Sequence, residues 1–276
     1  MRKILAIPLV LCAAIAATEE VKFVRQTPKV GLVRTQNEDT ASEFRITAKM
    51  DGRVVQDMTQ KESESNVLRS TVLSVADQRV TGVRALCVQS VRRVLNQEGR
   101  LVAVPNPCQG KTYIVKAKDD GPAVHYENGE APPDEELGWV KEQFRSLGKE
   151  DSFESMLDGK TVKVGEKLDV SLEAAAELLD VKSAGLKIEK FNLTLKAAKP
   201  HAVFDADIQM SQTLNGPKMT INMTGQVVIN PGNCWPVTVD IKGPLKLSGE
   251  QVQEGKRIDI KGAGTMSAKM SYGYGL

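Results

Sequence analysis

Apolar and polar residues alternate with a period of two through much of the C-terminal half of the chain. In residues 256–274, one parity carries apolar residues or glycine, and the other carries mostly charged or hydroxylated residues. The same alternation recurs at 191–197, 202–210, 218–229 and 237–247. Because successive side chains of a strand point to opposite faces, this pattern predicts an antiparallel sheet with one apolar and one solvated face.

The dipeptide Asn215-Gly216 predicts a hairpin between two of these segments, because Asn-Gly is the strongest short hairpin signal. Pairing about this turn places Ile208 opposite Met223. The apolar residues of both strands then share one face, as a sheet with one buried face requires.

The N-terminal half has further strand patterns at 43–50, 67–76, 80–95 and 111–118, so we expect about nine to eleven strands in all. Two short helices are expected between the halves. Pro132-Pro133-Asp134 is a helix start signal, and Ser171 is a suitable N-cap for a helix that runs to Leu179.

These patterns predict a mainly β fold with two short helices, of the α+β class. We expect a large curved antiparallel sheet or half-barrel, or two β-rich halves. The expected divisions are a signal peptide at 1–16, a flexible N-terminus at 17–27, an N-terminal β-rich half at 28–130, a helical connection at 131–185 and a C-terminal antiparallel β half at 186–276.

The N-terminus has the three parts of a secretory signal peptide. Met1-Arg2-Lys3 is basic, the run up to Ala13 is apolar, and Ala14-Ile15-Ala16 supplies a small-x-small cleavage pattern. The apolar run is too short to anchor the chain across a bilayer. We therefore expect a protein that is exported to the periplasm or outside a bacterial cell, and that is not an integral membrane protein.

Charge and composition exclude some partners. The chain has 37 Lys and Arg against 35 Asp and Glu, and removal of the signal peptide with Arg2 and Lys3 leaves it formally neutral. A neutral chain has no general attraction to nucleic acid. Aromatic residues make up only 4 % of the chain, which disfavours carbohydrate binding by ring stacking.

Three cysteines remain after the signal peptide, namely Cys87, Cys108 and Cys234. The turn signal at 96–99 predicts a hairpin centred between Gln97 and Glu98, which sets Cys87 opposite Cys108. Export to an oxidising compartment would favour a disulfide between them.

The sequence offers little catalytic chemistry, so we expect no enzyme, no cofactor and no metal. It contains two histidines and lacks nucleophile-elbow, zinc-protease and phosphate-loop motifs. His201, Asp205 and Asp207 share one strand face and could hold a metal. That face is the polar one, where solvated carboxylates are ordinary.

The long amphipathic strands, the paired helices and the signal peptide together resemble the exported half-barrel proteins of the lipoprotein-carrier (LolA-like) type, over residues 28–274. The segments GKTY at 110–113 and TVKVG at 161–165 are also similar to uncharacterised secreted bacterial β-rich proteins. The carrier resemblance implies a curved sheet around a cavity for acyl chains. It also implies a rival disulfide, Cys108–Cys234. The cavity arginine of the carrier family has no counterpart here, which puts lipoprotein transport in doubt.

The apolar face is rich in methionine, a flexible side chain that suits varied apolar ligands. We expect a non-enzymatic exported protein that binds an apolar or lipid-like ligand, or an envelope component, on the concave face. The candidate lining residues are Ile208, Met210, Met219, Met223, Ile260, Met266 and Met270. The alternative is a structural or interaction module of the envelope, in which the same residues form a packed core and the partner is an envelope protein.

Overall fold

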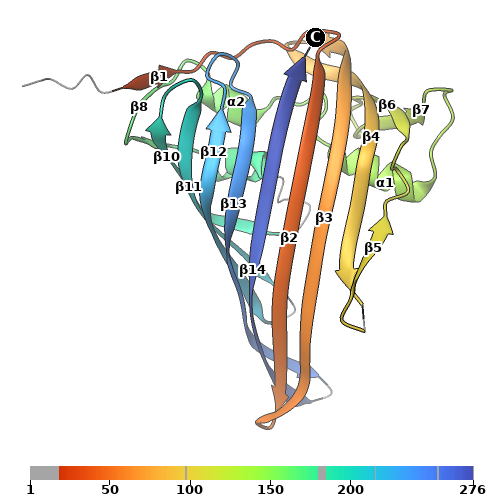
Figure 1. The fold of residues 1–276 in the computed structure, drawn as a ribbon, viewed down its shortest axis with the longest axis vertical. Helices are drawn as coiled ribbons and strands as arrows, with labels where there is room; N and C mark the ends of the chain where they lie inside the picture. The colour runs from red at the N-terminus through yellow and green to blue at the C-terminus, as the bar shows by residue number, and fades with distance from the viewer. Residues whose placement is uncertain (1–18, 97, 180–184, 215, 254, 276) are drawn as a thin grey trace, which may run out of the picture.

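The computed structural model describes residues 19–96, 98–179, 185–214, 216–253 and 255–275. These residues form one large antiparallel sheet, a separate two-stranded sheet and three short helices (Figure 1). The fold is mainly β, as the sequence predicted, and the large sheet is not closed into a barrel.

The strands of the large sheet follow one another in space in an order that differs from the sequence. In spatial order they are β7 (Ala123–Tyr126), β6 (Thr112–Lys116), β4 (Arg79–Leu95), β3 (Arg53–Ala76), β2 (Val33–Met50), β14 (Lys256–Gly275), β13 (Pro236–Gln253), β12 (Lys218–Ile229), β11 (Ala202–Thr213), β10 (Lys187–Ala197) and β9 (Lys167–Leu168), with β5 (Leu101–Pro105) paired beside β4.

Strand β14 links the strands of the N-terminal half to those of the C-terminal half. β14 pairs with β2 from Val33 to Met50 without a register shift. Strands from the N-terminal and C-terminal halves therefore form a single continuous sheet.

The predicted β11–β12 hairpin has the predicted register, although Asn215 itself lies outside the described residues. Ile208 pairs with Met223, and Met210 pairs with Ile221. All four side chains are buried, so the alternation correctly predicted which face is covered.

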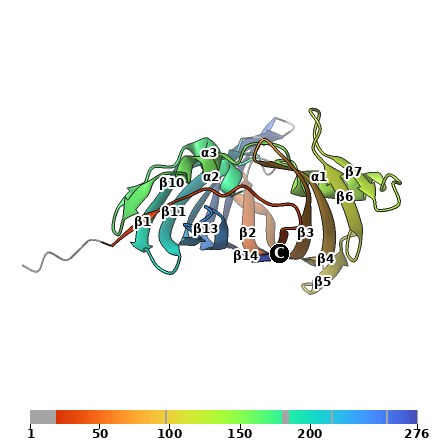
Figure 2. The same cartoon turned by 90° about the horizontal axis from the view of Figure 1, so that it is seen from above.

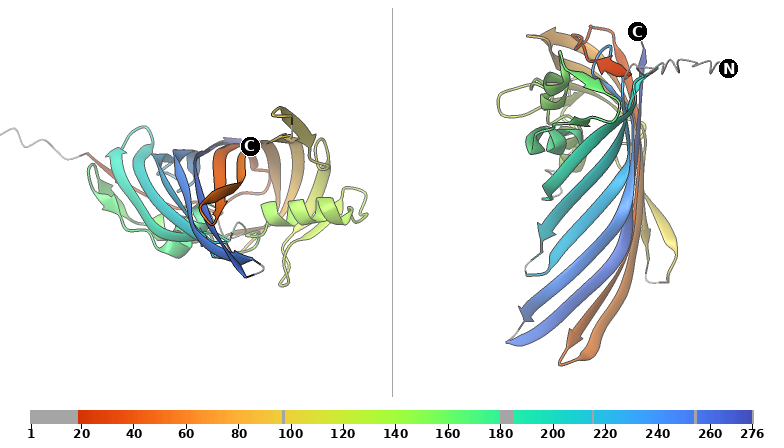
Figure 3. Two further views of the ribbon diagram at one scale, coloured as in Figure 1. Left: turned by 90° about the horizontal axis from the view of Figure 1, so that it is seen from below. Right: turned by 90° about the vertical axis from the view of Figure 1, so that its left-hand side faces the viewer.

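The sheet is strongly curved, and the three helices lie on its concave side (Figures 2 and 3). Two glycines on this side allow neighbouring strands to approach closely. A Cβ atom at Gly225 would overlap the carbonyl oxygen of Asp240, and one at Gly243 would overlap that of Asn222. Because a side chain would push the next strand away, these glycines permit the bend.

Two helices were predicted and one was not. α1 (Asp134–Gln143) follows Pro133, and α3 (Leu172–Leu178) begins after Ser171, whose Oγ accepts the Ala174 N–H at 3.2 Å. α2 (Ser152–Leu157) was missed because six residues are too short for a clear period. The Asp151 side chain caps it by accepting the Glu154 N–H at 2.8 Å.

The helices cover two separate cores on the concave side. The larger core joins strands β10 to β14 to α2 and α3, and includes Phe153, Leu157 and Ala175. The smaller core joins β4 and β6 to α1 through Tyr113 and Val140. The upper part of the sheet is therefore covered, whereas its long central strands continue below the helices (Figure 1).

The segment expected to be a flexible N-terminus contains ordered structure. β1 (Glu20–Lys22) pairs with β8 (Thr161–Lys163) to form the small sheet. Phe23 is fully buried against Phe204, with 6.2 Å between ring centroids. A single large aromatic side chain therefore anchors the segment in the larger core.

The structure also corrects the predicted disulfide. Cys87, Cys108 and Cys234 are all buried free thiols. The register of β4 with β5 pairs Leu95 with Leu101, one residue away from the predicted pairing, and Cys108 lies in the turn after Pro107 rather than in the strand. The rival Cys108–Cys234 bridge is also absent, because these two thiols belong to different cores.

The predicted signal peptide at 1–16 lies outside the described residues. Among the residues described, no helix is long and apolar enough to cross a membrane.

Candidate ligand-binding face

Three of the predicted lining residues lie inside the larger core. Ile208, Met210 and Met223 are 0 %, 2 % and 1 % exposed, beneath the helices on the concave side. Side chains packed this closely support the core, and a ligand could reach them only if the helices moved.

The other four predicted residues lie farther out on the same face. Met219, Met266 and Met270 are half-buried at the margin of the larger core. Ile260 is also half-buried, but it lies beyond the core, on the part of β14 that continues below the helices.

Ile260 belongs to a patch that we call the lower apolar strip, which consists of Ile46, Ala48, Met50, Met58, Ile258 and Ile260. Register places these residues on one face, because Ile260 pairs with Ala48, Ile258 with Met50, and Ile46 with Met58. All of them except Ala48 are partly exposed. No described helix lies over this part of the concave side (Figure 3).

Phe44 separates the lower apolar strip from the larger core. A Cβ atom at Gly262 would lie 3.0 Å from two atoms of the Phe44 ring, and one at Gly264 would lie 2.9 Å from Phe44 Cδ2. The ring therefore lies flat across the β14 backbone, in space that these glycines leave open. It packs against the larger core on one side and meets the strip on the other.

Polar residues interrupt the apolar face next to the cores. We call Glu38, Glu64, Asn66 and Ser90 the polar panel. Ser90 Oγ donates to Asn66 Oδ1 at 2.6 Å, and Asn66 Nδ2 donates to Glu64 Oε1 at 2.9 Å. Burial, and then the nearby Glu64 carboxylate, raise the pKa of Glu38. The panel therefore places acidic groups on the same face of the sheet as the apolar residues.

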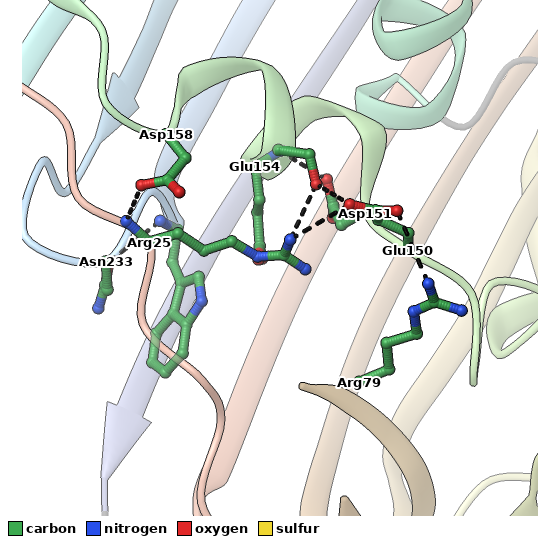
Figure 4. A network of polar contacts seen from close by, with 9 residues as sticks. Arg25, Arg79, Glu150, Asp151, Glu154, Asp158 and Asn233 are labelled. Atoms are coloured by element: carbon green, nitrogen blue, oxygen red, sulfur yellow. Dashed lines mark hydrogen bonds and ion pairs between the residues drawn. The ribbon is translucent and has the colours of Figure 1, made fainter. Parts of the chain in front are cut away.

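A second polar network ties the N-terminal segment to α2 (Figure 4). The Arg25 N–H donates to Asp158 at 2.9 Å, and its guanidinium donates to Ser155 Oγ at 2.9 Å. The same guanidinium lies 3.5 Å from both Glu150 and Glu154. These contacts hold α2 over the larger core.

A buried carboxylate holds α1 in the same way. Glu136 accepts hydrogen bonds from Lys111 Nζ at 2.5 Å, Tyr113 Oη at 2.7 Å and Tyr126 Oη at 2.6 Å. Burial would raise the pKa of Glu136, but these three donors outweigh it and hold the pKa below its ordinary value. Both carboxylate oxygens accept hydrogen bonds from the sheet side of the smaller core, so this cluster is a structural anchor for α1.

Two open hollows of about 660 and 380 Å³ lie along the central strands, and Met266 lines the larger one. Their walls are mainly serine, threonine and charged residues, such as Ser63, Thr265 and Lys242. Neither hollow includes a residue of the lower apolar strip. His201, Asp205 and Asp207 form no metal-binding group, and within the described ranges no three His, Cys, Asp or Glu side chains do.

Sequence reasoning identified Ile260 but missed the other members of the strip. The alternation at 43–50 places Phe44, Ile46 and Met50 on one face, so a signal was present. The pattern could not predict that β2 pairs with β14, and this pairing brings the two apolar rows together.

Comparison with known proteins assigns no family. No family model matches the chain, and no curated protein matches it. Among solved structures, the chain is similar to lipovitellin, in a structure that concerns lipid–protein interactions in that protein, with a TM-score of 0.40 and 8 % identity. The match covers 90 % of this chain and 26 % of the lipovitellin chain. The chain therefore spans about a quarter of that chain, and the similarity is too low to support an argument about function.

Proposed function

We propose that this is a non-enzymatic exported protein that binds an apolar or lipid-like ligand on the concave face of its sheet, at the lower apolar strip. The observation that carries the proposal is the continuation of the apolar face beyond its helices. Five of the six strip side chains remain partly exposed there, and contiguous exposed apolar surface of this kind marks binding sites in soluble proteins.

The lower apolar strip is better suited to bind a ligand than to form part of a packed core. The two cores already contain the buried side chains that join the helices to the sheet. The strip adds methionines at Met50 and Met58, whose flexible side chains adapt to ligands of different shape. The proposed location is the periplasm or cell surface, which rests on the signal-peptide pattern at 1–16.

Native mass spectrometry and uptake of a fluorescent fatty acid test this proposal. We expect the wild-type protein, purified from its own host, to carry a lipid-sized mass and to take up the probe. Ile260→Lys places a charge in the strip and should abolish uptake, because a lysine there is costly to bury beneath an acyl chain. Ile260 is the better target than Ile208, whose replacement in the core would unfold the protein.

A matched control is available on the same strand. Ala263 is exposed on the polar side of β14, opposite Arg45, so Ala263→Lys adds the same charge away from the strip. It should leave uptake unchanged. Wild-type protein that takes up no probe, or an Ile260→Lys variant that binds like the wild type while remaining folded, would contradict the proposal.

The close packing of both cores favours a second candidate, an interaction module of the cell envelope with no ligand. In that case the helices serve only to complete the cores, and the sheet contacts an envelope protein. A bare chain mass together with no fatty-acid uptake is the result that this candidate predicts.

A further inference from the structure

We propose that the ligand is a single-chain anionic amphiphile of the fatty-acid type, with its head group at Arg53 and Lys256 and its chain ending at Phe44. This inference rests on the proposed function and adds the chemistry and the orientation of the ligand. It rests on the different charged residues at the two ends of the lower apolar strip.

The lower end of the strip carries two unpaired cations. Arg53 pairs with Met50 in the register, and Lys256 is two residues before Ile258 on the same strand, so both lie on the face of the strip. Both are exposed, and neither has an ion-pair partner among the described residues. They are therefore free to receive a carboxylate.

Two nearby acids lie on the other side of the sheet, whereas Asp51 lies in the turn between β2 and β3, and Glu254 lies outside the described residues. Glu250 and Asp259 pair with one another in the register on the polar face, and Glu250 forms an ion pair with Arg257. Arg53 and Lys256 consequently place positive charge on the apolar face at the lower end of the strip, which complements an anionic head group.

The upper end of the strip carries acidic side chains instead. Phe44 closes it, and beyond Phe44 the same face carries Glu62, which forms an ion pair with Arg92, followed by Glu64 and Glu38 of the polar panel, which have no ion-pair partner among the described residues. Carboxylates repel an anionic head group. An anionic amphiphile therefore binds with its head at Arg53 and its methyl end towards Phe44.

The dimensions of the strip select one extended chain. From Phe44 to Met50 the strand advances by about 20 Å, which suits a long acyl chain. Glutamines flank the strip on its own face, since Gln56 pairs with Ala48 and Gln251 pairs with Ile258. The apolar surface is thus two strands wide at these rows, or about 5 Å between strand axes.

Binding of palmitate, compared with its uncharged alcohol cetyl alcohol, tests the head-group assignment. Arg53→Gln with Lys256→Gln should weaken palmitate binding about five- to tenfold, as expected for the loss of two exposed charge contacts. Binding of the alcohol should not change. The matched control, Lys49→Gln with Lys261→Gln, removes the same charge from the polar face and should leave palmitate binding as in the wild type.

A series from laurate to behenate tests the role of Phe44. Phe44→Ala removes the ring that ends the strip, so the preferred chain should become longer. Phe44→Leu keeps most of the packing against the larger core, so this variant replaces the alanine variant in the test if Phe44→Ala does not fold. It should produce a smaller shift in the same direction.

The outcomes separate this inference from the proposed function. If wild-type protein binds palmitate and the alcohol equally, and the Arg53/Lys256 variant binds palmitate as tightly as the wild type, the head-group assignment is overturned while ligand binding stands. An unchanged chain-length preference in both Phe44 variants overturns the end-stop role. If neither palmitate nor the alcohol binds the wild type, the proposed function itself fails.

Discussion

Replacement of Glu154 by glutamine should remove a large part of the pH dependence of the protein's stability. Glu154 lies on α2 against the N-terminal segment, with its Oε2 3.5 Å from Arg25 Nε (Figure 4). Burial, and then the nearby Asp151 carboxylate, raise the pKa of Glu154 to about 8, because the attraction to Arg25 and Arg34 only partly opposes them.

The direction of the effect follows from proton binding. In the unfolded chain the Glu154 carboxyl has its ordinary pKa of 4.5, so between that pH and about 8 the folded state binds a proton that the unfolded state does not. Stability is therefore fully present below the unfolded pKa and is lost as the pH rises towards 8. The loss is about 1.4 kcal/mol per pH unit, with an upper bound of about 5 kcal/mol.

Urea unfolding at a series of pH values measures this contribution. The free energy of unfolding of the wild type should fall relative to that of Glu154→Gln as the pH increases from about 5 to 8. Glu150→Gln is the control, because the hydrogen bond from Ser155 lowers the pKa of Glu150. Parallel curves for the wild type and Glu154→Gln across this range would refute the reasoning.

Three further substitutions test the packing. Phe23→Ala should cost about 3 kcal/mol of unfolding free energy and expose the N-terminal segment to limited proteolysis; unchanged protection would argue against anchoring by Phe23. Gly243→Ala should destabilise the protein by at least about 2 kcal/mol, measured by urea unfolding, because its Cβ would overlap the neighbouring strand. Gly273→Ala, which has open space around it, should change little, and equal effects would contradict this reason for the bend. Glu136→Gln should lose roughly 2–4 kcal/mol, because it weakens three hydrogen bonds to a buried carboxylate; a neutral result would show that α1 does not depend on this anchor.

The candidate site was predicted in part. Alternation placed Ile208 and Ile260 on the same apolar face, but it could not distinguish the residue beneath the helices from the one beyond them. That distinction depends on which strands α2 and α3 cover, and these are long-range contacts that the alternation of a strand does not encode. The polar panel was missed because its members come from three strands, β2, β3 and β4, which only the tertiary structure brings side by side.

The sequence by itself determined the features that depend on near neighbours. The strand alternation, the Ile208–Met223 register and the Ser171 cap follow from residues close together in the chain, where turn chemistry and side-chain period act directly. Tertiary structure alone decided the pairing of β14 with β2, the position of Cys108 and the exposure of the lower apolar strip. These depend on contacts between segments that are distant in the chain, which turn chemistry and side-chain period do not encode.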